Sequence, residues 1–162
     1  MYTDIDRVAA LERRVAQLEA HFTPSQQQSP AFALIEAINR NDELVDGVVT
    51  FGGAVDTGIG HYECEWSRPT HWVKDSPWED EISRLSALAH PQRGEILRRL
   101  LGAPATVVEL VSGDIVSSTG TAYHHLGALQ AAGWVTKHDG GYAIPPARVI
   151  PLLVIITARE AH

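Results

Sequence analysis

Small hydrogen-bonding side chains gather at the start of one expected helix. Ser118 is a favourable N-cap, and Gly133 is placed to end this helix as its C-terminal cap. Ala122, Leu126 and Leu129 recur at helical spacing and predict a buried face. The first turn would then present hydroxyl, phenol and imidazole groups outward, where they can hydrogen bond to base edges in the major groove of DNA. We predict DNA contacts for Ser118, Thr119, Gly120, Thr121, Tyr123 and His124.

No other set of residues predicts catalysis or metal binding. Gly52 and Gly53 lie in an expected hairpin and not in a strand-to-helix phosphate loop. The single cysteine, Cys64, excludes a disulfide framework or a multi-cysteine zinc site within one chain. We therefore expect no enzyme activity, no metal site and no cofactor.

The elements around the capped helix predict a winged helix-turn-helix. Upstream lie a helix ending at Gly102 and a short helix opened by a capping box, Thr106 to Glu109. Downstream, residues 134–137 and 142–144 read as two strands joined by an Asp-Gly-Gly turn. This hairpin is the wing, and we predict that Lys137 and His138 on it contact the DNA backbone. The predicted fold class is α+β, mainly helical.

Residues 82–158 resemble the DNA-binding domain of the ArsR-like winged-helix regulators. The stretch Leu88-Ala-His-Pro-Gln-Arg-Gly-Glu-Ile-Leu97 matches the family pattern Leu-x-His-Pro-x-Arg-x-x-Ile-Leu. Further matches are Tyr123-His-His-Leu126, Leu129, Ala132-Gly133 and Val135. The resemblance implies a homodimeric transcriptional regulator, with double-stranded DNA as its partner and repression as its usual role. The single cysteine and the lack of a leader or membrane-spanning pattern predict a cytoplasmic protein. The metal-sensing members carry cysteines on the first helix of the helix-turn-helix, and this chain has none there, so a conventional metal sensor is not expected.

The N-terminal half adds parts that lie outside this resemblance. Residues 4–22 carry an apolar a/d seam typical of a short coiled coil. A polar linker follows, then a helix opened by Ser29 and Pro30, then an expected hairpin over residues 48–66. We predict three domains: residues 1–28, a coiled-coil helix with its linker; 29–75, a helix with a β-hairpin that serves dimerisation or effector binding; and 76–162, the winged helix with a C-terminal dimerisation helix. A Ser-Pro-Trp-Glu capping box that begins at Ser76 is expected to open the first helix of the third domain.

Two apolar segments predict self-association. The coiled-coil seam shares this role with the last helix, which is too apolar all round to face water. The predicted dimerisation residues are Val8, Leu11, Val15, Leu18, Val149, Leu152, Leu153 and Ile156.

Three tryptophans near the middle of the chain could line an apolar pocket for a small-molecule effector of unknown identity. They are Trp66, Trp72 and Trp78. The alternative for each of them is ordinary packing in a core.

The charge distribution leaves a second function open. The chain of 162 residues has a formal net charge of −7, but residues 1–80 carry −8 and residues 81–162 carry +1. The C-terminal half can therefore approach DNA, although it has no basic footprint. The alternative is a winged helix that binds a protein partner instead of DNA. The longest apolar run is too short to cross a bilayer, so no membrane association is expected.

Overall fold

The computed structural model describes residues 8, 11–15, 30–40 and 46–160, and divides the chain into two units, Met1–Gly47 and Val48–His162. In the first unit, residue 8 and residues 11–15 are helical, and helix α2 spans Pro30–Asn39. Val8, Leu11 and Val15 of the predicted coiled-coil seam are about half exposed, and Leu18 lies outside the described residues. The coiled coil stays a prediction.

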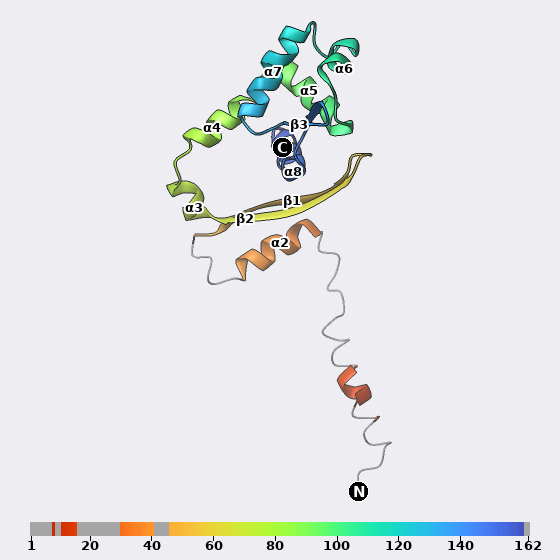
Figure 1. Ribbon diagram of the computed structural model, residues 1–162. Helices are drawn as coiled ribbons and strands as arrows, with labels where there is room; N and C mark the ends of the chain where they lie inside the picture. Colours follow the sequence, from red (N-terminus) through yellow and green to blue (C-terminus); the bar gives the residue numbers. More distant parts are fainter. Residues whose placement is uncertain (1–7, 9–10, 16–29, 41–45, 161–162) are drawn as a thin grey trace. The chain divides into compact units, whose positions relative to one another are not determined.

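The second unit contains two antiparallel hairpins and six helices in its described part (Figure 1). The predicted α+β class is confirmed, and the order of the elements is compatible with a winged-helix fold. The elements are β1 (Val48–Asp56), β2 (His61–Pro69), α3 (Thr70–Asp75), α4 (Glu79–Ser86), α5 (Pro91–Gly102), α6 (Val107–Ser112), α7 (Thr119–Ala131), β3 (Thr136–His138), β4 (Gly141–Ala143) and α8 (Pro146–Ala158).

One apolar cluster joins α5, α6, α7, the wing and α8. Ile96, Leu110 and Leu126 are fully shielded from solvent within it. Burial of side chains this size stabilises a fold by roughly 1.5–3 kcal/mol each, so the cluster fixes how these helices pack. Trp134 and Val135, predicted in a strand, precede β3 and belong to this core instead.

The N-caps of α5, α6 and α7 are local, because each capping side chain accepts from a backbone amide two or three residues later. The Thr106 side chain accepts from the Glu109 backbone N–H while the Glu109 carboxylate accepts from the Thr106 N–H, which is the predicted capping box. His90 Nδ1 accepts from the Gln92 N–H and so caps α5. The Ser118 side chain caps α7.

The predicted capping box at Ser76 is wrong. Helix α4 begins at Glu79, with Trp78 at its N-cap and no side-chain cap. The Ser76 hydroxyl instead donates to the carbonyl oxygen of Val73 at 3.1 Å, and Trp78 Nε1 donates to the same oxygen at 2.9 Å. Both side chains therefore close the end of α3, a helix that the sequence pattern did not predict.

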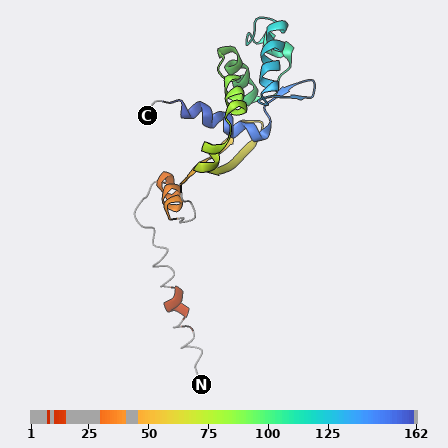
Figure 2. The ribbon, with the colours of Figure 1, turned by 90° about the vertical axis from the view of Figure 1, so that its left-hand side faces the viewer.

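The long hairpin β1–β2 lies along α8, which contacts both strands (Figure 2). Ile150 packs over Gly53, where an added Cβ would meet the Ile150 side chain at 3.7 Å. The hairpin is thus part of the C-terminal unit, and the predicted boundary between residues 75 and 76 does not match the division between Gly47 and Val48. The apolar side chains of α8 must be shielded from water, and this hairpin shields part of them.

The same packing changes the role of α8. Val149 and Leu152, predicted at a dimer interface, are buried in the chain's own core at 3% exposure each. Leu153 is half-buried, and Ile156 is 47% exposed. Of this predicted set on α8, Ile156 has the most surface to offer a partner.

Gly141 holds the wing against the start of α6. Ala105 and Tyr142 exchange two backbone hydrogen bonds, and a Cβ at position 141 would come within 2.8 Å of the Ala105 carbonyl oxygen. We expect Gly141→Ala to lower the free energy of unfolding by about 1–3 kcal/mol, because the backbone cannot yield there. A matched Gly127→Ala variant on α7 meets no atom within 4 Å and should raise it by up to about 1 kcal/mol. Urea unfolding of both variants measures this, and equal effects would contradict the close approach.

Candidate nucleic-acid interface

The first turn of α7 is rigidly capped. Ser118 Oγ accepts from the Thr121 backbone N–H at 3.2 Å and lies 2.9 Å from the Thr121 hydroxyl oxygen. Thr121 is half-buried, so its hydroxyl is engaged in the cap. Its contact with DNA stays a prediction, and the structure also gives it a role in the cap of α7.

The rotation of α7 about its axis is set by its buried side. Ala122, Leu126 and Leu129 have no solvent exposure. The Tyr123 side chain is 60% exposed on the other side. Exposed with it are Ser118, Thr119, Gly120 and His124.

The wing turn needs left-handed backbone at two positions. Asp139 has φ of 46° and Gly140 has φ of 79°, as a two-residue turn between twisted strands requires. The predicted contacts Lys137 and His138 are both exposed on β3, just before this turn. His138 Nε2 lies 3.5 Å from an Asp139 carboxylate oxygen.

Helix α7 and the wing share one hollow of about 540 Å³. Tyr123 from α7 and Lys137 and His138 from the wing all line it. The structure thus brings together side chains that the sequence predicts on two separate elements. Val108 of α6 lines the same hollow and is 70% exposed. The sequence pattern does not single out Val108, because a six-residue helix does not show which of two adjacent valines is buried.

The hollow has one lysine and one carboxylate in its lining, Lys137 and Asp139. Glu109, next to Val108 in the sequence, adds a second carboxylate on α6. Hydrogen bonds from the backbone and hydroxyl of Thr106 hold the pKa of Glu109 below its usual value, so this carboxylate is ionised at neutral pH. Arg98 pairs with Glu95 at 2.6 Å and is not placed in this hollow. The interface therefore offers mainly neutral hydrogen-bonding groups.

The ring of His125 lies next to the rings of two other histidines, His90 and His124. His125 is buried at 8% exposure, as expected for a packed residue, and its ring lies 4.6 Å from that of His90 and 5.2 Å from that of His124. Burial lowers the pKa of His125, and the nearby His90, His124 and Arg93 lower it further.

The three tryptophans predicted to line an effector pocket are exposed and lie next to an arginine. Trp66, Trp72 and Trp78 are 47%, 55% and 55% exposed. The Arg68 guanidinium lies 4.5 Å from the Trp66 ring centre and 5.2 Å from that of Trp72, while Phe51 stacks beside Trp66. An arginine thus occupies the faces of two of the rings, and an effector bound by the tryptophans stays a prediction.

The described part of the chain has no group of three His, Cys, Asp or Glu residues placed to hold a metal ion. No helix among the described residues has the length and apolar character needed to cross a membrane.

Comparison with known proteins gives one similar structure. No family model matches the chain, and no curated protein matches it either. The crystal structure of M. tuberculosis Rv0081 is 30% identical and has a TM-score of 0.44, and the match covers 52% of this chain and 89% of that one.

The histidine cluster predicts a loss of stability in acid. Because the fold lowers the pKa of His125, protonation favours the unfolded chain, so stability falls as the pH drops below about 6.5. Thermal unfolding between pH 7.5 and 5 should show a smaller decrease in Tm for His125→Gln than for the unmodified protein. The control His71→Gln, exposed on α3, should keep the original slope. An unchanged slope in His125→Gln would rule out this origin.

Proposed function

We propose that this protein is a DNA-binding transcriptional regulator that inserts the start of α7 into the major groove and lays its wing on the adjacent backbone. The observation that carries the proposal is the hollow shared by Tyr123, Lys137 and His138. A helix about 10–12 Å wide fits a major groove about 12 Å wide. A neighbouring hairpin is then within reach of the phosphates.

The chemistry of the exposed turn suits base reading. Thr119 and Tyr123 carry hydroxyl groups that donate and accept, and Gly120 adds no bulk between them. The opposite face of the helix is buried in the core, so the backbone that carries these groups approaches DNA already ordered. A preordered backbone loses little entropy on binding, which favours specific contacts.

The low positive charge of the wing affects how much of the DNA affinity is non-specific. Phosphate neutralisation supplies most non-specific affinity. With Lys137 as the exposed basic residue of the wing, non-specific binding should be weak and base contacts should contribute a large share of the affinity. The acidic N-terminal half would further disfavour non-specific binding.

The proposal includes a homodimer that acts as an ArsR-like repressor. Trp78, Ile82 and Leu85 lie at helical spacing and are 55%, 54% and 42% exposed, which gives α4 an uncovered apolar stripe. The seam residues Val8, Leu11 and Val15 form a second exposed apolar set on their own unit. Surfaces of this kind usually mark an interface. A dimer would place two α7 helices on two half-sites, and occupied half-sites near a promoter would block transcription.

One observation favours a second candidate function, a winged helix that binds protein. Val108, beside the hollow, is 70% exposed and apolar, which suits a protein partner better than phosphate. The salt dependence of DNA binding separates the two functions, because binding to DNA must release counterions.

Tyr123 gives the sharpest test of the recognition face. We expect Tyr123→Ala to weaken binding to duplexes retained from a random pool by about 1–3 kcal/mol, through loss of a base contact. The matched control Gln130→Ala changes an exposed residue at the far end of α7 and should bind as the unmodified protein does. Fluorescence anisotropy measures both, with circular dichroism to verify folding. Equal affinities for the two variants would exclude α7 from the interface.

Lys137 tests the wing. If it neutralises one phosphate, Lys137→Ala should weaken binding to all duplexes alike and reduce the slope of log K against log salt by about 1 per protomer. Lys74→Ala on α3 removes the same charge away from the hollow and should leave the slope unchanged. The proposal for the wing fails if both variants show the same slope as the unmodified protein.

A further inference from the structure

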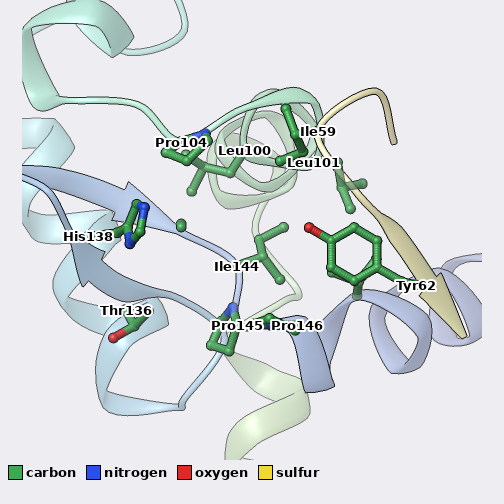
Figure 3. Close-up of a pocket in the computed structure, with 12 residues that line it drawn as sticks. Ile59, Tyr62, Leu100, Leu101, Pro104, Thr136, His138, Ile144, Pro145 and Pro146 are labelled. Atoms are coloured by element: carbon green, nitrogen blue, oxygen red, sulfur yellow. The ribbon is translucent and has the colours of Figure 1, made fainter. Parts of the chain in front are cut away.

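A second hollow, of about 390 Å³, lies on the other side of the wing (Figure 3). Its wall comes from four places in the chain: the β1–β2 turn, the end of α5, the wing strands and the start of α8. Ile59 and Tyr62 contribute from the hairpin, Leu101 from α5 and Ile144 from the segment between β4 and α8. Small-molecule sites typically begin at about 300 Å³, so the space is large enough for one.

The lining is apolar with a few polar groups. Proline rings at positions 104, 145 and 146 provide flat surfaces, and no carboxylate, ammonium or guanidinium group lines the space. Among the described residues, the Tyr62 hydroxyl has no hydrogen-bond partner, and Figure 3 shows it directed into the space. Thr136 and His138 stand at the wing side. The hydroxyl is therefore free to bond a ligand.

We propose that this cavity binds a small neutral aromatic molecule of one or two rings that carries one hydrogen-bonding group. Flat rings match the proline, leucine and isoleucine walls, and the hydrogen-bonding group pairs with the Tyr62 hydroxyl. A charged ligand would lose its hydration without gaining an opposite charge, so a neutral one binds better. This site differs from the tryptophan cluster around Arg68, which shares none of its lining residues.

The wing strands connect this cavity with the DNA-facing hollow. Successive residues of a strand point to opposite faces. Accordingly Thr136 and Ala143 line the cavity, Lys137 and Tyr142 line the DNA-facing hollow, and His138 lines both. A ligand in the cavity therefore contacts the strand that positions Lys137. The resulting change in DNA affinity rests on the proposed function, whereas ligand binding itself does not.

The test uses 2-naphthol as the probe and the full-length protein. Calorimetry should show one probe per chain, with Kd below about 1 mM as expected for a ligand of this size. Amide NMR shifts should centre on the hairpin turn, the end of α5 and the wing. The anionic analogue 2-naphthoate should bind at least about tenfold more weakly, because no lysine or arginine lines the cavity.

Two exposed hairpin residues give a matched pair of variants. Ile59 lines the cavity and is 49% exposed, and Val49 lies outside it and is 54% exposed. Ile59→Trp should fill the mouth and raise the Kd at least tenfold, whereas Val49→Trp should leave it unchanged. Tyr62→Phe should raise the Kd several-fold without unfolding the chain, because only the hydroxyl is removed.

The outcomes separate this proposal from the DNA-binding one. Equal probe binding by the Ile59→Trp and Val49→Trp variants, shifts centred elsewhere, or no saturable binding would each overturn the ligand site. These readouts need no DNA, so they hold whether or not the chain binds it. If the probe binds as expected and DNA affinity does not change, the ligand site stands and its regulatory role is wrong.

Discussion

The burial of one side of α7 is the constraint on which the rest depends. Ala122, Leu126 and Leu129 are fully enclosed, so the helix cannot turn about its axis without opening the core. Truncating one such leucine to alanine typically costs 2–5 kcal/mol, a large part of the stability of a small domain. This packing leaves the side chain of Tyr123 exposed and places it beside the wing.

The two faces of the wing strands line two different hollows. The attachment of the wing through Ala105 and Gly141 leaves no room for a side chain at position 141, so the strands stay close to α6. One face of the strands lines the hollow next to Tyr123, and the other lines the apolar cavity beside the long hairpin. A part of the chain outside the resemblance to ArsR-like regulators thus completes a space next to the proposed DNA-binding element.

What the sequence predicts well is local. The caps at Thr106 and Ser118 depend on residues three positions apart, and both form as expected. The cap at Ser76 fails because α3, just before it, competes for the same hydroxyl. Long-range packing has no such signal: nothing near Val149 shows that it faces its own core, and nothing near Ile59 shows that it lines a cavity together with the end of α5.

In the proposed function, α7 reads DNA sequence as part of a symmetric pair of helices in a homodimer. Sequencing the duplexes that the full-length protein retains from a random pool, at near-physiological salt, tests it most directly. We expect enrichment of an inverted repeat with half-sites about one helical turn apart. A retained pool with no shared sequence, from protein that circular dichroism shows to be folded, would contradict sequence reading and favour a protein partner.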